Sequence, residues 1–141
     1  MATPGDREVR YATVVTAVGA LVPEFGQAGV LVWFEEGAPE ELHDFSVLHR
    51  PTVATGGVVP GDEISLDGAV LTVLAVGDVA NDNLVNLGHL DLKASGETSP
   101  QLPGDVCTER LPLPELRPGS TLTIVAGGAG VRKSPVGRET P

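Results

Sequence analysis

The segment FEEGAPEELHDFSVLH, residues 34–49, runs from the end of one apolar strand through a short helix into a second strand. Pro39 occupies a position that favours the first residue of a helix, and the negative charges of Glu40 and Glu41 favour a helix N-terminus. An apolar strand pattern resumes a few residues later and ends on His49. The helix is therefore limited to one or two turns, which is too short for the crossover of a parallel βαβ unit. This segment favours an antiparallel sheet.

Short apolar runs separated by turn residues make up most of the remaining chain. The Val- and Thr-rich run at residues 9–18 is typical of a strand. Asp67-Gly68, between the apolar segments 64–66 and 69–76, is a strong hairpin signal. Three Pro-Gly pairs mark further turns that lead into strands, at residues 60–61, 103–104 and 118–119.

A second helix is predicted at residues 79–87. Asp78 can cap its N-terminus, and Gly88 stands where helices often end in the left-handed conformation. His89 then opens a strand that extends to Lys93. Seven to nine short strands and two short helices predict an all-β fold. We expect a small, mostly antiparallel, closed or nearly closed β-barrel, because closure removes exposed strand edges.

Length and composition indicate one domain. At 141 residues the chain is long enough to bury a core of its own. We expect the barrel domain at residues 1–125 and a flexible C-terminal tail at residues 126–141, which have too few apolar side chains to anchor them. Cys107 is the only cysteine, so the chain forms no internal disulfide, and its neighbours are typical of a strand.

The acidic composition limits the classes of partner. The formal net charge is −10, which would repel nucleic acid and anionic lipid and attract a basic protein face. The alternative is that the acidity only supports solubility. The apolar run at residues 12–22 is interpreted as a strand and not as a signal peptide, since Pro23 and Glu24 follow it. No run reaches the roughly 18–20 apolar residues of a membrane helix, so we expect a cytoplasmic protein without direct membrane insertion.

The chain has three histidines, His43, His49 and His89, and imidazole suits phosphoryl transfer. Its pKa near ~6.5 leaves one ring nitrogen unprotonated at neutral pH. His49 falls at a predicted strand end, where its ring would be accessible, and Arg50 could offset phosphate charge. Taken alone, however, a histidine at a strand end is usually an ordinary surface residue. Nearby hydrogen-bond donors for phosphoryl oxygens are Thr52, Thr55 and the amides of Gly56 and Gly57.

The other two histidines allow several interpretations. His89 follows the helix-ending Gly88 and could stand beside the nucleophile, or it could be only a capping or partly buried residue. His43 lies in an acidic turn and is expected to be solvated. A metal site built from the histidines and nearby acids stays open, although His43 and His49 have no standard ligand spacing. The sequence has neither a GxxxxGK[ST] loop nor a GxSxG motif.

Two blocks of the chain form a family pattern. The first is F-x-E-G-A-P-x-x-L with the apolar-apolar-His end of the next strand, and the second is AVG-x-VA-x-x-NL-x-x-LGH within residues 73–92. Together they resemble the glucitol/sorbitol-specific enzyme IIA family of the bacterial sugar phosphotransferase system (PTS), over roughly residues 11–125. The chain departs from that family at Arg50-Pro51, which replaces a more polar stretch that often holds another histidine. The departure puts the set of phosphate donors in doubt.

The resemblance implies a β-barrel phosphotransferase component with a phosphohistidine intermediate. It would accept phosphate on His49 from the phosphocarrier HPr and pass it to the IIB component of a IIB/IIC sugar-alcohol permease. His89 and Arg50 would be auxiliary groups, and no metal or organic cofactor would be needed. A homodimer is compatible with strand exchange between barrels. The alternative is a regulatory barrel of the same fold that binds a partner or ligand without transferring phosphate. The sequence leaves open the sugar alcohol and the imidazole nitrogen involved.

Overall fold

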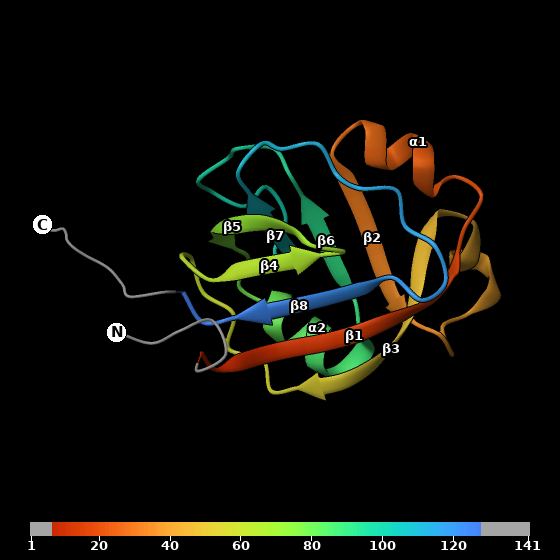
Figure 1. Ribbon diagram of the computed structural model, residues 1–141, viewed down its shortest axis with the longest axis horizontal. Helices are drawn as coiled ribbons and strands as arrows, with labels where there is room; N and C mark the ends of the chain where they lie inside the picture. The colour runs from red at the N-terminus through yellow and green to blue at the C-terminus, as the bar shows by residue number, and fades with distance from the viewer. Residues whose placement is uncertain (1–6, 128–141) are drawn as a thin grey trace, which may run out of the picture.

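The computed structural model describes residues 7–127, and eight strands in this range close into a barrel. The strands follow one another in the order β1-β3-β2-β6-β7-β5-β4-β8, and pairing of β8 with β1 completes the ring (Figure 1). The predicted all-β barrel is therefore confirmed. The strands are β1 (Val9–Val18), β2 (Val30–Glu35), β3 (Ser46–Ala54), β4 (Glu63–Leu66), β5 (Ala69–Val76), β6 (Leu90–Lys93), β7 (Asp105–Thr108) and β8 (Thr121–Val125).

Alternation along the strands fills the barrel interior. On β1, the buried residues Tyr11, Thr13 and Val15 alternate with exposed or half-buried residues. Trp33 on β2 and Ile64 on β4 are buried in the same apolar cluster as Tyr11. The interior is therefore built from side chains that are far apart in the sequence.

Two strand pairs are parallel, which the sequence did not predict. β2 pairs in parallel with β3, from Val32 opposite Ser46 onward, and β6 pairs in parallel with β7. Residues 36–45, with the 3-10 helix η2 (Glu40–Phe45), return the chain to the level of Val32. The parallel pairing of β2 with β3 covers only four residues of each strand. The connection therefore returns over only about 13 Å and needs no long helix. The other six strand pairs are antiparallel, as predicted.

The described residues hold three short helical segments where the sequence predicted two. The unpredicted one is α1 (Val22–Gln27), which follows β1 directly. Pro23 at its start and Glu24 in its first turn are the same signals that indicated η2. In the sequence these two residues argued only against a signal-peptide cleavage site, so this helix was not predicted.

The helix α2 (Ala80–Leu87) packs its buried Ala80 and Leu84 into the core cluster. It ends at Gly88 in the left-handed conformation, with a φ of 61°, as predicted. The capping role predicted for Asp78 is wrong, because Val79 is the N-cap residue and no side chain caps this end.

The predicted hairpin joins β4 to β5. Asp67 and Gly68 have φ angles of 49° and 89°, the left-handed pair that a two-residue hairpin turn requires. At the other end of the chain, the amides of Ala126 and Gly127 donate to Glu8 and Asp62. Residues 128–141 of the predicted flexible tail lie outside the described residues, so the tail stays a prediction.

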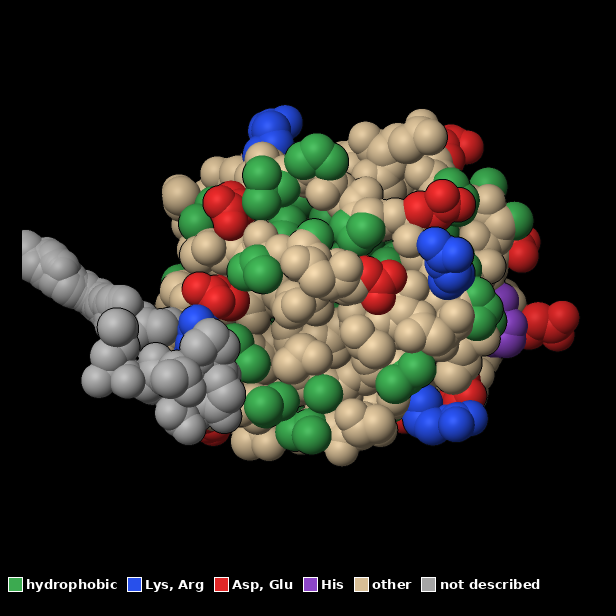
Figure 2. Space-filling view, in the orientation of Figure 1, with side chains coloured by type: hydrophobic (Ala, Val, Ile, Leu, Met, Phe, Trp, Pro, Cys, Tyr) green, Lys and Arg blue, Asp and Glu red, His purple; other side chains and the backbone are tan. Residues whose placement is uncertain are grey.

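On the face drawn in Figure 2, acidic and basic side chains are scattered among apolar ones, without a continuous basic area. None of the helices in residues 7–127 is long and apolar enough to cross a membrane.

Candidate functional site

His49 lies inside the barrel, on β3, and its side chain is only 1% exposed. The expectation of an accessible ring at a strand end is wrong. The strand continues past His49 to Ala54, so that His49 is an interior position of β3. Strand alternation then directs its ring inward and the next side chain, Arg50, outward.

Both ring nitrogens of His49 are hydrogen-bonded. Nε2 lies 2.7 Å from the backbone oxygen of Gly88, which can only accept, so Nε2 carries the proton and donates. Nδ1 lies 2.6 Å from Oγ1 of Thr13, so the Thr13 hydroxyl donates to it when the ring is neutral. Burial lowers the pKa of His49, and the hydrogen bond to Gly88 raises it by a smaller amount. The site therefore favours the neutral imidazole, with its proton on Nε2.

Two aromatic side chains border the His49 ring. Trp33 on β2 and Tyr11 on β1 make edge contacts, with ring centroids 5.5 Å and 6.3 Å from that of His49. Burial, with a smaller contribution from the charge of Glu35, raises the pKa of Tyr11. Among the described residues, the Tyr11 hydroxyl and Trp33 Nε1 are buried without a hydrogen-bond partner. The two aromatics nearest the histidine thus carry unused donors.

The sequence gave no reason to associate Thr13, Tyr11 or Trp33 with His49. Alternation along β1 could have indicated that Tyr11 and Thr13 share a face. The missing information is that β1 and β3 are neighbours, with Val15 opposite His49. That pairing joins residues more than thirty positions apart, since Thr13 and His49 are separated by 36.

Gly88 covers the Nε2 edge of the ring. It is buried, and a side chain at this position would overlap Cγ of Glu35 and lie 3.1 Å from Cε1 of His49. Its left-handed φ also favours glycine. The preceding Leu87 is 55% exposed, so the chain lies at the surface one residue before Gly88. A single turn of backbone therefore closes the ring from this side.

The ring of His89 contacts Phe34 and Asp91 and forms no hydrogen bond with His49. The ring stacks on Phe34 of β2, with centroids 4.3 Å apart, and its Nε2 lies 3.5 Å from Oδ2 of Asp91. The hydrogen bond to Asp91 raises the pKa of His89, with burial opposing it. The backbone oxygen of Gly88, the residue before His89, thus contacts His49, whereas the His89 ring contacts Phe34. Its auxiliary role stays a prediction.

Several of the predicted phosphate donors near His49 in sequence form hydrogen bonds elsewhere in the fold. Arg50 is exposed and forms two hydrogen bonds with Glu36, of 2.7 and 3.2 Å. The amides of Thr55 and Gly56 both donate to the backbone oxygen of Arg10. The structure does not bring these groups to the His49 ring in this state, so the stabilising role of Arg50 stays a prediction.

His43 offers no support for a metal site. Its Nε2 lies 2.8 Å from the backbone oxygen of Ala38 on the same connection. Within residues 7–127, no group of three or more His, Cys, Asp or Glu side chains is placed to hold a metal ion. The hypothesis of a histidine metal centre therefore has no ligand cluster in the described part of the chain.

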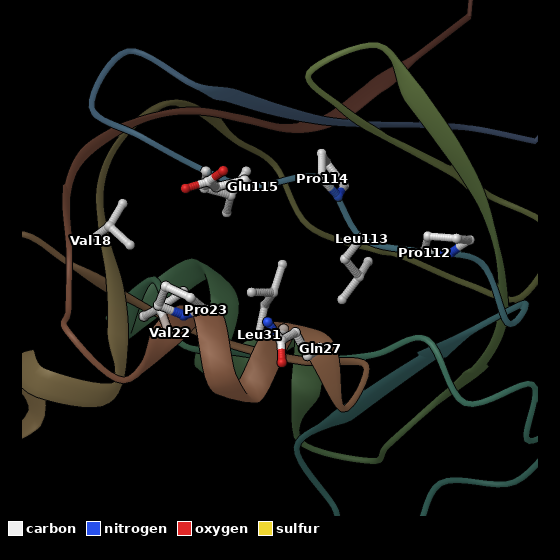
Figure 3. Close-up of a pocket in the computed structure, with 11 residues that line it drawn as sticks. Val18, Val22, Pro23, Gln27, Leu31, Pro112, Leu113, Pro114 and Glu115 are labelled. Carbon is white, nitrogen blue, oxygen red and sulfur yellow. The ribbon is translucent and has the colours of Figure 1, made fainter.

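A separate cavity of about 450 Å³ lies between α1 and the proline-rich segment at residues 112–116 (Figure 3). Its walls are mainly apolar, with Gln27 and Glu115 as polar lining residues. Leu31 of β2 forms part of the wall, but none of the hydrogen-bonded or aromatic neighbours of His49 described above does. The cavity is therefore distinct from the histidine site.

Comparison with known proteins places this barrel in a class. The crystal structure of the PTS system IIA component from Enterococcus faecalis V583 superimposes with a TM-score of 0.69 and 21% sequence identity. The match covers 82% of this chain and 99% of that one, so the two chains share a fold.

Sequence comparisons define the family within that class. The family model for the PTS system glucitol/sorbitol-specific IIA component matches residues 10–123. The glucitol/sorbitol-specific EIIA components of Shigella flexneri and Escherichia coli (strain K12) are each 36% identical over 115 residues, which is 81% of this chain and 93% of each relative. This chain belongs to the glucitol/sorbitol-specific IIA family of the PTS. The resemblance inferred from its motifs is confirmed.

Proposed function

We propose that this protein is a cytoplasmic phosphoryl carrier that accepts phosphate on His49 from phospho-HPr. It would pass the phosphate to the IIB component of a glucitol/sorbitol permease. Two observations support the proposal: residues 10–123 match the glucitol/sorbitol-specific IIA family, and the buried site of His49 favours a neutral imidazole. A neutral imidazole has the lone pair that a phosphoryl acceptor needs.

The surroundings of the histidines favour His49 as the acceptor. Burial lowers the pKa of His49 and so favours the neutral, nucleophilic form. The pair with Asp91 raises the pKa of His89 and favours its protonated form, which has no free lone pair. His89 is therefore the poorer nucleophile of the two.

Transfer requires that the cover over His49 moves. The ring is 1% exposed, and the carbonyl of Gly88 occupies its outer edge. Two backbone hydrogen bonds hold this turn on α2, from Gly88 N to Leu84 O and from His89 N to Asn83 O, each of 3.1 Å. We propose that the turn swings outward when a partner binds, since terminal turns of short helices open at low cost. Transfer would then depend on positioning and charge stabilisation, and it requires no cofactor.

A second function is favoured by two observations. Both nitrogens of His49 are already hydrogen-bonded within the fold, and a cavity of about 450 Å³ lies beside α1. That volume is in the range of small-molecule sites. The chain could therefore be a regulatory barrel that keeps the family fold and binds a ligand or partner without transferring phosphate.

Phosphorylation with purified enzyme I, HPr and labelled phosphoenolpyruvate separates the two functions. The carrier is expected to take up acid-labile, base-stable label that His49→Ala abolishes and the matched variants His43→Ala and His89→Ala retain. Circular dichroism of each variant checks that it is folded. An unlabelled wild-type chain, with an active IIA protein labelled in parallel, would favour the regulatory barrel. Label that persists in His49→Ala would contradict the assignment of the acceptor.

Passage to a permease is tested by adding the cognate IIB domain to the isolated phosphorylated chain. We expect label to leave the IIA barrel and appear on IIB, because a carrier must donate as readily as it accepts. The net charge of −10 should also make the exchange with HPr slow down as salt is added. Label that stays on the chain would limit the protein to a phosphate acceptor.

A further inference from the structure

We propose that the buried hydroxyl of Tyr11 and the indole N–H of Trp33 bind the oxygens of the phosphoryl group that His49 carries. The inference rests on the proposed function. It adds the side chains of this barrel that donate hydrogen bonds to the phosphoryl oxygens.

A phosphoryl group on His49 needs hydrogen-bond donors around its oxygens. The His49 side chain is 1% exposed, and a charged group in such a place is costly unless donors meet it. The carboxylate of Glu35, the residue opposite His49 in the β2–β3 pair, adds a repulsion. Arg50, the nearest cation in sequence, lies outside and pairs with Glu36. Donors carried by side chains inside the barrel would meet this need.

Tyr11 and Trp33 border the His49 ring, and each has a donor without a partner. Their ring centroids lie 6.3 and 5.5 Å from that of His49, and each side chain is 1% exposed. Among the described residues, neither the Tyr11 hydroxyl nor Trp33 Nε1 has a hydrogen-bond partner. Thr13, whose hydroxyl also reaches the ring, is already bonded to Nδ1. Two free donors thus belong to side chains in edge contact with the histidine.

The Tyr11 hydroxyl is linked to the side of the site that Gly88 covers. Burial raises the pKa of Tyr11, and the charge of Glu35 raises it further, so the hydroxyl keeps its proton at neutral pH. Glu35 in turn contacts Gly88, because a side chain on Gly88 would overlap Cγ of Glu35. The phenol is therefore within electrostatic range of the turn that would open to a partner.

The two free donors cost stability in the resting barrel, and a phosphoryl group would remove that cost. A buried donor without an acceptor has lost its hydrogen bonds to water and gained none in return. Phosphoryl oxygens are charged acceptors, which form stronger hydrogen bonds than neutral ones. Donors that are already packed in place also need little reorganisation when charge arrives. The same two groups thus destabilise the resting state and stabilise the phosphorylated one.

The transfer is balanced without any further reactant. His49 supplies the electron pair for the new P–N bond while the P–N bond of the donor phosphohistidine breaks, and that electron pair returns to the donor imidazole. Tyr11 and Trp33 donate hydrogen bonds and neither gain nor lose a proton. They bind the group that moves and take no part in the bonds that form and break.

Tyr11→Phe removes only the hydroxyl, and Ser46→Ala is its matched control. Ser46 is 0% exposed, its hydroxyl also lacks a partner within the described residues, and alternation along β3 directs it to the face opposite that of His49. With phospho-HPr as donor, we expect Tyr11→Phe to be phosphorylated at least about 10-fold more slowly than the wild type and Ser46→Ala to stay within about twofold.

Urea unfolding separates this role from a structural one. Both variants should unfold at the wild-type urea concentration or above it, because each loses a buried group without a partner. A stable Tyr11→Phe that matches the wild-type rate would overturn the role of the hydroxyl. A Tyr11→Phe that loses stability would overturn it as well, since the hydroxyl would then have a partner in the resting state.

Trp33 is the only tryptophan in the chain, so its indole N–H can be observed directly in the wild type. In ¹⁵N-labelled protein we expect a single indole signal, whose proton moves downfield on phosphorylation as the hydrogen bond to a charged oxygen forms. His49→Ala treated in the same way should show no such change. An indole signal that does not move in the phosphorylated wild type would overturn the role of Trp33, even if Trp33→Phe failed to fold.

A small phosphoryl donor separates failure of this inference from failure of the proposed function. Phosphoramidate transfers its phosphoryl group with loss of ammonia and needs no protein partner. Labelling of His49 by phosphoramidate, slowed in Tyr11→Phe, kept in Ser46→Ala and accompanied by the indole shift, would support the inference even if HPr did not label the chain. Rapid labelling of Tyr11→Phe by HPr, with no indole shift in the wild type, would keep the carrier function and reject the inference. A chain that neither donor labels would overturn both.

Discussion

His49 contacts Trp33 and His89 stacks on Phe34, two consecutive residues of β2 whose side chains point to opposite faces of the sheet. The surroundings of the two rings shift their pKa values in opposite directions. Inside the barrel, burial lowers the pKa of His49. On the outside, the carboxylate of Asp91 raises the pKa of His89, although its ring is partly buried against Phe34. The same side chain type is thus biased toward the neutral form in one place and toward the cation in the other. The difference comes from solvation and from one neighbouring charge.

This contrast predicts opposite pH dependences of stability. The folded pKa of His49 is below its unfolded value near 6.5, so its contribution is full above that pH and is lost as the pH falls through the folded pKa. The folded pKa of His89 is above its unfolded value. Its contribution is full below pH 6.5 and is lost as the pH rises through the folded pKa.

Urea unfolding of wild type, His49→Gln and His89→Gln between pH 5 and 8 measures both effects. The free energy that the wild type gains over His49→Gln should shrink toward pH 5. The gain over His89→Gln should shrink toward pH 8. Two differences that change in the same direction would contradict the assigned surroundings of one of the rings.

The turns depend on local backbone conformation, and the β4–β5 hairpin allows the effect of one positive φ angle to be tested by itself. Gly68 has a φ of 89° and open space where a side chain would be placed. Gly37 also has open space, but its φ is not positive. The two glycines therefore differ in backbone conformation and not in crowding.

We expect Gly68→Ala to lower the free energy of unfolding by about 1–2 kcal/mol, because alanine is strained in the left-handed region. Gly37→Ala should be neutral or stabilise by up to about 1 kcal/mol, since alanine restricts the unfolded chain. Chemical denaturation of both variants is the measurement. Equal effects at the two positions would show that something other than φ controls the hairpin.

β8 pairs with β1 on one side and with β4 on the other, which closes the barrel. Asp62 connects the chain segments at this closure, here called the seam. Its carboxylate is 2% exposed and accepts hydrogen bonds from Arg10 on β1 and from the amides of Val59 and Gly127. Arg10 also pairs with Glu8, whose side chain is 60% exposed, at 3.4 Å. One arginine thus has a buried and an exposed carboxylate partner.

Asp62→Ala should lower the free energy of unfolding by about 3 kcal/mol or more, because it leaves two amides without their acceptor and Arg10 with only the exposed Glu8 as a partner. Glu8→Ala should change it by less than about 0.5 kcal/mol, since exposed ion pairs contribute little. Thermal and urea unfolding of the two variants give the comparison. A small effect at Asp62 would mean that solvent replaces its bonds at the seam.

Sequence reasoning succeeded where the cause is local. The strand β1, the Asp67-Gly68 turn and the helix end at Gly88 follow from side-chain alternation and from backbone angles that few residues adopt. The family pattern also depends on short blocks with fixed spacing. These features depend on residues a few positions apart, so the linear order of the chain contains them.

The tertiary structure decided the properties of the candidate site. It made β2 and β3 parallel, turned the His49 ring inward, and set Thr13 and Gly88 against its two nitrogens from 36 and 39 residues away. Such contacts depend on which strands become neighbours and in which register they pair. Barrel closure fixes both through the packing of the entire core, and no local stretch of the chain specifies them.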